Sequence, residues 1–260
     1  MLQQNVCLTN NYKVMKQSKL THGSLFSGIG GFELGAEMAG IDTLWNCEIE
    51  KFQGEILKNK FPHAERFTDI TKTTSLRYVD IISGGFPCQD ISVAGKREGI
   101  KGERSGLWSE MYRIIREVRP KYVIVENSPA LTISGLEQVL CDLSKIGYDA
   151  EWQCISNYAF GYPHKRERLY LIAYSNQIGL QGDICNNGCF NSIFKQWASD
   201  TNIGYTCAKR IFEIPAHSTV RNDDGFPNWS HRVGSIGNAV NPTLAKYLFE
   251  CIKIFDKQLA

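Results

Sequence analysis

Two groups capable of covalent and acid–base chemistry lie at the ends of apolar, strand-like segments. Cys88 follows segment 78–83 after the bend Gly84-Gly85-Phe86-Pro87, and Glu126 ends the segment Tyr122–Glu126. Parallel sheets carry their working groups at the carboxyl ends of strands, so we expect the thiol and the carboxyl to share one edge of a sheet. A thiolate is a nucleophile and a carboxyl can deliver a proton. The pair therefore indicates covalent catalysis with acid assistance.

A glycine-rich turn between a predicted strand and a predicted helix indicates a ligand site. Gly28 and Gly30 begin a dinucleotide-binding pattern, but Glu33 stands where a third glycine is needed, which disfavours NAD. The helix that follows can hold a carboxylate at its N-terminus. Glu48 ends the next strand, where it suits a ribose diol, and Asp69 ends the third, where it suits an adenine edge. A ligand with carboxylate, ribose and adenine but no phosphate is S-adenosyl-L-methionine.

A simpler interpretation gives these residues local roles only. The glycines would make a tight turn, and Glu48 and Asp69 would be solvated caps. Each residue alone is ambiguous. Their order along successive strand ends favours the ligand interpretation, because those ends lie together at one edge of a parallel sheet.

The elements expected from local patterns alternate between strands and helices. Strands are predicted at 24–26, 44–48, 66–69, 78–83, 122–126, 152–155 and 169–174. Helices are predicted from the glycine turn to 39, and at 51–60, 107–118, 136–146 and 243–255. This succession predicts an α/β fold with a doubly wound, mostly parallel sheet.

Four regions follow from changes in composition. Residues 1–20 are polar and are expected to be a disordered leader, and residues 21–175 form the catalytic and cofactor-binding domain. Residues 176–231, rich in Asn, Gly, Ser and Asp, form a small irregular excursion. Residues 232–260 return to the main domain through a helix.

Composition excludes several classes of protein. The 260 residues are 43% apolar and 22% charged with a net charge of +2, which suits one sizeable domain and leaves a polyanionic partner open. We see no signal peptide and no run of membrane-spanning length, so we expect a cytoplasmic protein without a membrane partner. Nine cysteines without a CxxC pair indicate free thiols. Cys185, Cys189 and Cys207 lack a clear fourth ligand, so we expect no metal.

Five short motifs resemble, in order, those of cytosine-5 DNA methyltransferases of the bacterial restriction-modification or phage type. They are Leu25–Phe32, Gly84–Gln89, Val125–Asn127, Phe160–Arg168 and Gly237–Val240. Each motif alone is a weak match, but five in the family's order are specific. They extend over nearly the whole chain outside the leader and the excursion.

The resemblance implies a role for each reactive group. Cys88 would add to C6 of cytosine, and Glu126 would hydrogen-bond N3 and the amino group from a dry pocket that raises its pKa. Arg168 would contact the base carbonyl or position the pocket, and Arg166 would support it or a phosphate. The residues implied to bind S-adenosyl-L-methionine are Phe26, Ser27, Gly28, Gly30, Gly31, Glu48, Asp69, Ile70, Asn238 and Ala239.

The resemblance also implies duplex DNA as the substrate, with the target base flipped out of the helix. Residues 90–106, flexible and basic, fit a mobile lid, and 176–231 occupies the position of a target-recognition region. Expected DNA contacts are Gln89, Ser92, Lys96, Arg97, Lys101, Arg104, Lys195, Lys209 and Arg210. A cognate restriction endonuclease that acts on the same site is a possible partner, and we expect the protein to be a monomer in a bacterial or phage-infected cell.

Four positions depart from the family pattern, and two other functions stay open. His164 stands where glutamine is usual, which leaves undefined what supports the segment Phe160–Arg168, the arginine loop that carries Arg166 and Arg168. Ile91, Ser128 and Ser235 also differ. None of these changes removes a reacting group. The alternatives are a tRNA cytosine-5 methyltransferase of the same fold and a catalytically inactive DNA-binding relative. Intact Cys88 and Glu126 count against the inactive relative.

Overall fold

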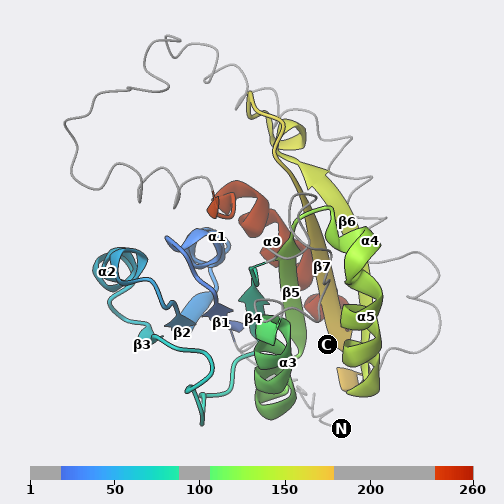
Figure 1. Cartoon of the computed structure of the whole chain (residues 1–260), viewed down its shortest axis with the longest axis horizontal. Helices are drawn as coiled ribbons and strands as arrows, with labels where there is room; N and C mark the ends of the chain where they lie inside the picture. Colours follow the sequence, from blue (N-terminus) through green and yellow to red (C-terminus); the bar gives the residue numbers. More distant parts are fainter. Residues whose placement is uncertain (1–18, 88–105, 179–237, 260) are drawn as a thin grey trace, which may run out of the picture.

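A computed structural model of the chain describes residues 19–87, 106–178 and 238–259. This part contains a seven-stranded sheet with the order β3-β2-β1-β4-β5-β7-β6 (Figure 1). Neighbouring strands from β3 to β5 pair in parallel, whereas β7 runs antiparallel to both β5 and β6. The predicted α/β fold with a doubly wound, mostly parallel sheet is confirmed.

The strands and helices alternate along the chain as expected. The strands are β1 Thr21–Leu25, β2 Asp42–Cys47, β3 Glu65–Phe67, β4 Ile81–Gly84, β5 Tyr122–Asn127, β6 Tyr148–Ser156 and β7 Glu167–Ser175. The helices are α1 Gly31–Met38, α2 Lys51–Lys60, α3 Gly106–Val118, α4 Leu131–Ser134, α5 Leu136–Lys145 and α9 Pro242–Leu259, with 3-10 turns η3 Asn157–Phe160 and η4 Asn176–Ile178.

Several boundaries differ from the sequence prediction. The third strand ends at Phe67, so Asp69 lies beyond it in a turn. The fourth strand begins only at Ile81, and the short helix α4 was not predicted. The strands β6 and β7 are longer than expected because they pair with each other along their full lengths, a contact that local propensity does not register.

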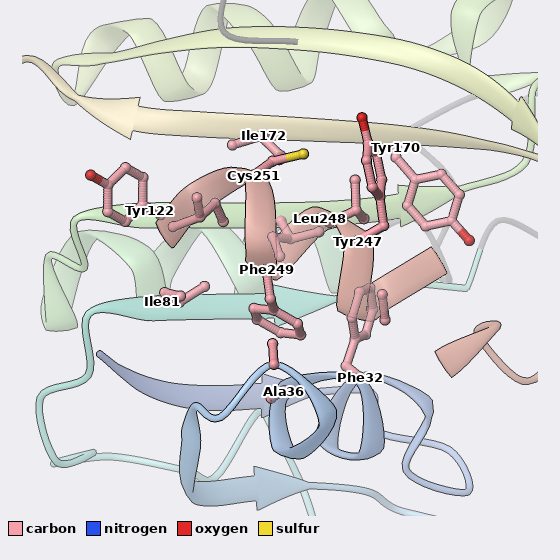
Figure 2. Packing of buried hydrophobic residues seen from close by; sticks show 14 of the residues in the cluster. Phe32, Ala36, Ile81, Tyr122, Tyr170, Ile172, Tyr247, Leu248, Phe249 and Cys251 are labelled. Atoms are coloured by element: carbon pink, nitrogen blue, oxygen red, sulfur yellow. The ribbon is translucent and has the colours of Figure 1, made fainter. Parts of the chain in front are cut away.

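Helices α1 and α9 cover one face of the sheet. Leu248 and Phe249 of α9 lie with Phe32 and Ala36 of α1 over strand residues such as Ile81 (Figure 2). Burying a large apolar side chain of this kind contributes roughly 1.5–3 kcal/mol. The C-terminal helix is therefore part of the core that supports the first strands.

Helices α3 and α5 cover the opposite face. Met111 and Ile114 of α3 and Val139 of α5 are fully buried against strand residues such as Val123 and Val125. The strand β5 is buried at all six positions, which explains why its sequence is a continuous apolar run that ends in two polar residues. Those two residues, at its carboxyl end, belong to the candidate site.

A buried histidine ties the central strands together. The Nδ1 atom of His22 lies 2.9 Å from the Thr43 hydroxyl and its Nε2 lies 2.7 Å from the Ser83 hydroxyl, so β2, β1 and β4 are joined. Burial lowers the pKa of His22 to about 3, and the ring is neutral. We assign it a structural role.

The chain before β1 contributes to the core at its last position. Leu20, placed by sequence in the leader, is 7% exposed and packs in the cluster beneath α1 and α9. Within the described residues, no helix combines the length and apolar character needed to cross a membrane.

Candidate active site

The reversed strand β7 brings a basic side chain to the carboxyl end of β5. Glu126 pairs in register with Tyr170, and Asn127 with Leu169, so Arg168, the second residue of β7, lies beside these strand-end residues. Its Nε atom lies 3.1 Å from Oε1 of Glu126. The side chain of Glu126 is 12% exposed and that of Arg168 is 30% exposed, so the ion pair lies at the edge of the buried sheet.

Burial dominates the electrostatics of this pair. Removal from water raises the pKa of Glu126, while the positive charges of Arg168 and Arg166 oppose that rise. The same burial lowers the pKa of Arg166, with the like charge of Arg168 acting in the same direction. Glu126 therefore takes up a proton more readily than a solvated glutamate does, as a proton-donating role requires.

The segment that leads to Cys88 is held against the same strand end. The side-chain amide of Asn127 donates to the carbonyl of Phe86 at 3.1 Å. A Cβ atom at Gly85 would lie only 2.7 Å from Oε2 of Glu126, so the absence of a side chain there leaves room for the carboxyl. Cys88 itself lies just outside the described residues, as do all nine expected DNA contacts, from Gln89 to Arg210.

The glycine-rich turn is fixed to the end of β2 by Glu48. The backbone N–H of Gly28 donates to Oε2 of Glu48 at 2.7 Å, and that of Glu50 donates to Oε1 at 2.9 Å. Ser27 also donates its N–H to the carbonyl of Cys47 at 3.1 Å. These bonds hold Glu48, which is 7% exposed, in one orientation beside the turn. A carboxylate held in this way can accept hydroxyl donors from a sugar.

Two backbone features explain why the turn has this sequence. Gly30 has a φ of 90°, and a Cβ atom there would lie 2.5 Å from the ring of Phe61. Phe26 has a φ of 54°, which is uncommon for a residue other than glycine and marks a constrained backbone at this position.

The last predicted cofactor segment lies directly on this turn. A Cβ atom at Gly31 would come within 2.4 Å of the carbonyl oxygen of Val240. The segment that contains Asn238 and Ala239 is therefore brought next to the glycine turn from the far end of the chain. The structure thus brings the segment before α9 to the turn that follows β1, and Glu48 at the end of β2 bonds to the same turn.

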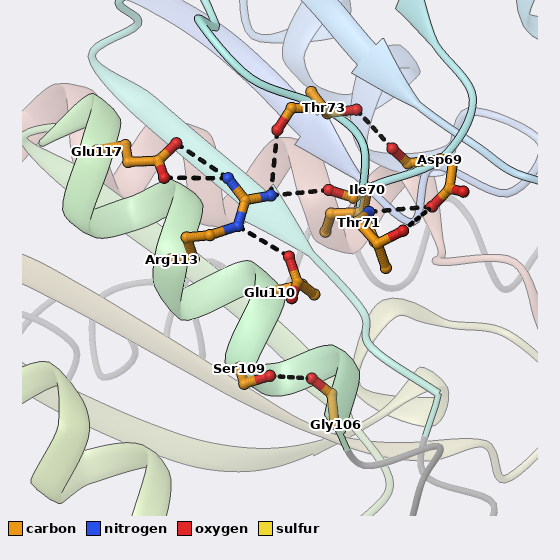
Figure 3. Close-up of polar contacts among 9 residues, drawn as sticks. All are labelled: Asp69, Ile70, Thr71, Thr73, Gly106, Ser109, Glu110, Arg113 and Glu117. Atoms are coloured by element: carbon orange, nitrogen blue, oxygen red, sulfur yellow. Dashed lines mark hydrogen bonds and ion pairs between the residues drawn. The ribbon is translucent and has the colours of Figure 1, made fainter.

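Asp69 and Ile70 lie in a turn that α3 holds in place (Figure 3). Arg113 donates to the carbonyls of Ile70 and Thr73 at 2.8 and 3.1 Å and forms ion pairs with two glutamates of its own helix. Oδ1 of Asp69 accepts from the backbone and hydroxyl of Thr71, hydrogen bonds that lower its pKa. Asp69 is therefore a cap of its own turn, and any contact with a ligand would come in addition to that role. The side chain of Ile70 is buried in the core.

Glu33 has an environment that the sequence did not reveal. It is fully buried, and among the described residues neither of its carboxyl oxygens has a hydrogen-bond partner. The hydroxyls of Ser27 and Ser24, whose oxygens lie 3.0 Å apart, are near Glu33 and act to lower its pKa. Burial raises the pKa of Glu33 to about 7. Glu33, whose place in the sequence disfavours NAD, is thus a buried carboxyl beneath the glycine-rich turn.

A sequence profile of the C-5 cytosine-specific DNA methylase family matches residues 20–224, which is more than half of the chain. The match includes the strand ends that carry Glu48 and Glu126, the glycine turn and the arginine loop. The chain belongs to the C-5 cytosine-specific DNA methylase family.

Curated relatives of this family member are type II methyltransferases. The chain is 35% identical over 158 residues to M2.BsuMI of Bacillus subtilis (strain 168), covering 58% of this chain and 41% of that protein. It is 32% identical over 163 residues to M.HhaI of Haemophilus parahaemolyticus, covering 60% and 50%. The chain thus spans about half of these relatives' length or less.

Solved structures agree on the methylase fold. The Entamoeba histolytica methyltransferase EhMeth superposes with a TM-score of 0.63 at 16% identity, covering 93% of this chain and 99% of that one. The Dnmt2 methyltransferase of S. pombe gives 0.54 at 23% identity, covering 64% and 53%. At these identities the likeness concerns the fold.

Two residues next to the candidate site were not expected from the sequence. Ile49, directly after Glu48, is 68% exposed, an unusual position for an isoleucine beside a predicted ligand site. Asn157 is 5% exposed and connects the arginine loop to α9. For Ile49, the signal in the sequence is an apolar residue that stands between two glutamates, Glu48 and Glu50. Nothing local marks Asn157.

Proposed function

We propose that the protein transfers a methyl group from S-adenosyl-L-methionine to C5 of cytosine in a specific sequence of duplex DNA. The observation that carries the proposal is the buried Glu126, 3.1 Å from Arg168, at the strand end beside the segment that leads to Cys88. A thiol, a carboxyl of raised pKa and an arginine at one sheet edge supply a nucleophile, a proton donor and an anion-binding group.

The chemistry follows from the low nucleophilicity of C5. Addition of the Cys88 thiolate to C6 moves electron density to C5 and N3, and protonated Glu126 stabilises that charge with a hydrogen bond to N3. Arg168 orients Glu126 and contacts the base carbonyl, and Arg166 supports it from the same loop. Once C5 carries the methyl group, loss of the C5 proton lets the Cys88 thiolate leave C6 by β-elimination, which restores the C5–C6 double bond.

The chain's residues suit the proposed cofactor. Bound S-adenosyl-L-methionine supplies the methyl group from its sulfonium. Glu48, fixed by two backbone N–H groups, would accept hydrogen bonds from the ribose hydroxyls. The turn from Phe26 to Gly31 would contact the ligand through its backbone atoms. Asp69, Ile70, Asn238 and Ala239 complete the proposed cofactor set.

The remaining assignments concern the partner. Residues 90–106 would close over DNA through Lys96, Arg97, Lys101 and Arg104, with Gln89 and Ser92 next to the base. Region 176–231 would read the sequence, with Lys195, Lys209 and Arg210 among its contacts. A restriction endonuclease specific for the same site would be a natural counterpart in the cytoplasm, and the protein would act as a monomer.

One experiment separates the possible activities. Radiolabelled S-adenosyl-L-methionine is supplied with duplex DNA or with tRNA, and the product is mapped. We expect label in duplex DNA at cytosine C5. Label in tRNA would identify an RNA enzyme, and no label in either substrate would identify an inactive relative.

The nucleophile is tested with Cys88→Ser. We expect this variant to lose methyl transfer while calorimetric binding of the cofactor stays near normal. DNA with 5-fluorocytosine at the target should trap the wild-type protein covalently, because fluorine cannot leave as a proton does. Full activity in Cys88→Ser would refute the covalent mechanism.

A further inference from the structure

Asn157 is the centre of a hydrogen-bonded junction beside the candidate site. Its backbone N–H donates to the carbonyl of Arg166 at 3.0 Å, and its carbonyl accepts from the N–H of Tyr162 at 3.2 Å. Its side-chain Nδ2 lies 2.8 Å from Nε2 of His164, and its Oδ1 accepts from Nδ2 of Asn241 at 3.2 Å. Every polar group of this buried residue is therefore used.

The direction of these hydrogen bonds is fixed from the α9 end. Asn241 precedes Pro242 and caps the helix, since its Oδ1 accepts from the backbone N–H of Thr243 at 3.0 Å. A backbone N–H can only donate, so Oδ1 of Asn241 faces Thr243 and its Nδ2 faces Asn157. Asn157 must then present Oδ1 to Asn241 and Nδ2 to His164.

We infer that this chain of amides makes His164 and Asn157 positioning residues of the arginine loop and requires Nε2 of His164 to be an unprotonated acceptor. The neutral ring must therefore carry its proton on Nδ1. Because His164 is exposed, its Nδ1–H can donate to water.

The junction links both halves of the proposed site. On one side it holds the carbonyl of Arg166, two residues before the Arg168 that reaches Glu126. On the other side it holds the start of α9 through Asn241, and the residue before Asn241, Val240, lies next to Gly31 of the glycine-rich turn. Tyr162 reinforces the link, because its hydroxyl lies 2.9 Å from that of Thr243. The functional part of this inference rests on the proposed methyl transfer; the ring tautomer does not.

The tautomer is tested by ¹⁵N NMR of the imidazole in the full-length protein. We expect the wild-type His164 signal of an Nδ1–H ring with a bare Nε2. Asn241→Asp keeps the helix cap but offers Asn157 only an acceptor, so the Asn157 amide should reverse and His164 should change to the Nε2–H form. Asn176→Asp adds the same charge at an exposed site and should leave the signal unchanged. An Nε2–H ring in the wild type, or no change in Asn241→Asp, would overturn the inference.

Positioning is tested by the rate of DNA methylation. His164→Leu leaves Nδ2 of Asn157 without an acceptor, so we expect kcat to fall about tenfold, the scale of one lost hydrogen bond to a buried group. His164→Gln supplies an amide oxygen and should restore most of the rate. His63→Leu removes an exposed histidine elsewhere as a control. If Leu and Gln at position 164 behave alike, His164 does not position the loop. A wild type without methylation activity would refute the proposed function and leave the NMR result valid.

Discussion

The chemistry of the site depends on a few side chains whose surroundings differ sharply. Glu126 is buried beside two arginines, whereas Glu33 is buried with no hydrogen-bond partner among the residues described. The pKa of Glu126 is raised at the candidate site itself, and the pKa of Glu33 is raised in the core below that site. Individual substitutions can therefore separate catalysis from stability.

Gly85→Ala should impair catalysis more than folding. The added methyl would lie 2.7 Å from Oε2 of Glu126, the end of a flexible side chain that can move aside, so the carboxyl shifts while the fold persists. A displaced catalytic group costs about 10- to 100-fold in rate. We expect kcat for DNA methylation to fall on that scale, with the Tm and cofactor affinity close to wild type. An unchanged kcat would mean that the position of this carboxyl does not limit the rate.

Glu33→Gln should stabilise the protein in alkaline solution. Because the folded pKa of about 7 lies above the usual 4.5, the folded state is fully stable with respect to this group below pH 4.5 and loses stability as pH rises through 7. Ionisation then costs up to roughly 3 kcal/mol. The free energy of unfolding in urea should favour the variant at pH 8 by much more than at pH 5. Glu37→Gln, an exposed change in the same helix, should show no such dependence. A gap between Glu33→Gln and wild type that stays constant with pH would contradict the assignment.

The strands and helices determine which of these side chains meet. Helix α2 lies at Lys51–Lys60 as its sequence predicts, because local propensity and burial agree there. The Glu126–Arg168 contact required the antiparallel placement of β7, and Asn157 required the approach of α9. Contacts between segments far apart in sequence leave no local periodicity. The resemblance identified the arginines by motif, but Gly85, Glu33 and Asn157 became interpretable only through their neighbours in space.

The connection between β2 and the glycine turn can be tested through Glu48. Glu48→Ala removes the acceptor for Gly28 and Glu50 and the proposed partner of the ribose hydroxyls. We expect the affinity for S-adenosyl-L-methionine to fall by about 1–3 kcal/mol, the scale for a charged hydrogen-bond partner. Calorimetry measures this directly, with NAD as a ligand that should not compete. Unaltered affinity in the variant would place the ribose elsewhere.

For the molecule as a whole, we expect DNA binding and sequence reading to be separate. Neutralising Lys96, Arg97, Lys101 and Arg104 should weaken binding to every DNA sequence and flatten its dependence on salt, because fewer counterions are released. Replacing 176–231 with the corresponding region of another family member should change which cytosine is methylated. Bisulfite sequencing of plasmids methylated by each variant compares the two. A switch of target in the charge variants would show that the assignment is incorrect.

The contact between Val240 and Gly31 also bears on the order in which the protein becomes competent during synthesis. The cofactor turn leaves the ribosome long before the helix that packs against it, and α1 finds its main partner only when α9 has been made. A nascent chain that already contains the glycine turn, Cys88 and Glu126 still has an uncovered apolar face on α1. Methylation competence should therefore arise only after α9 has been made, and ribosome-bound chains stalled before α9 should be susceptible to proteases at α1.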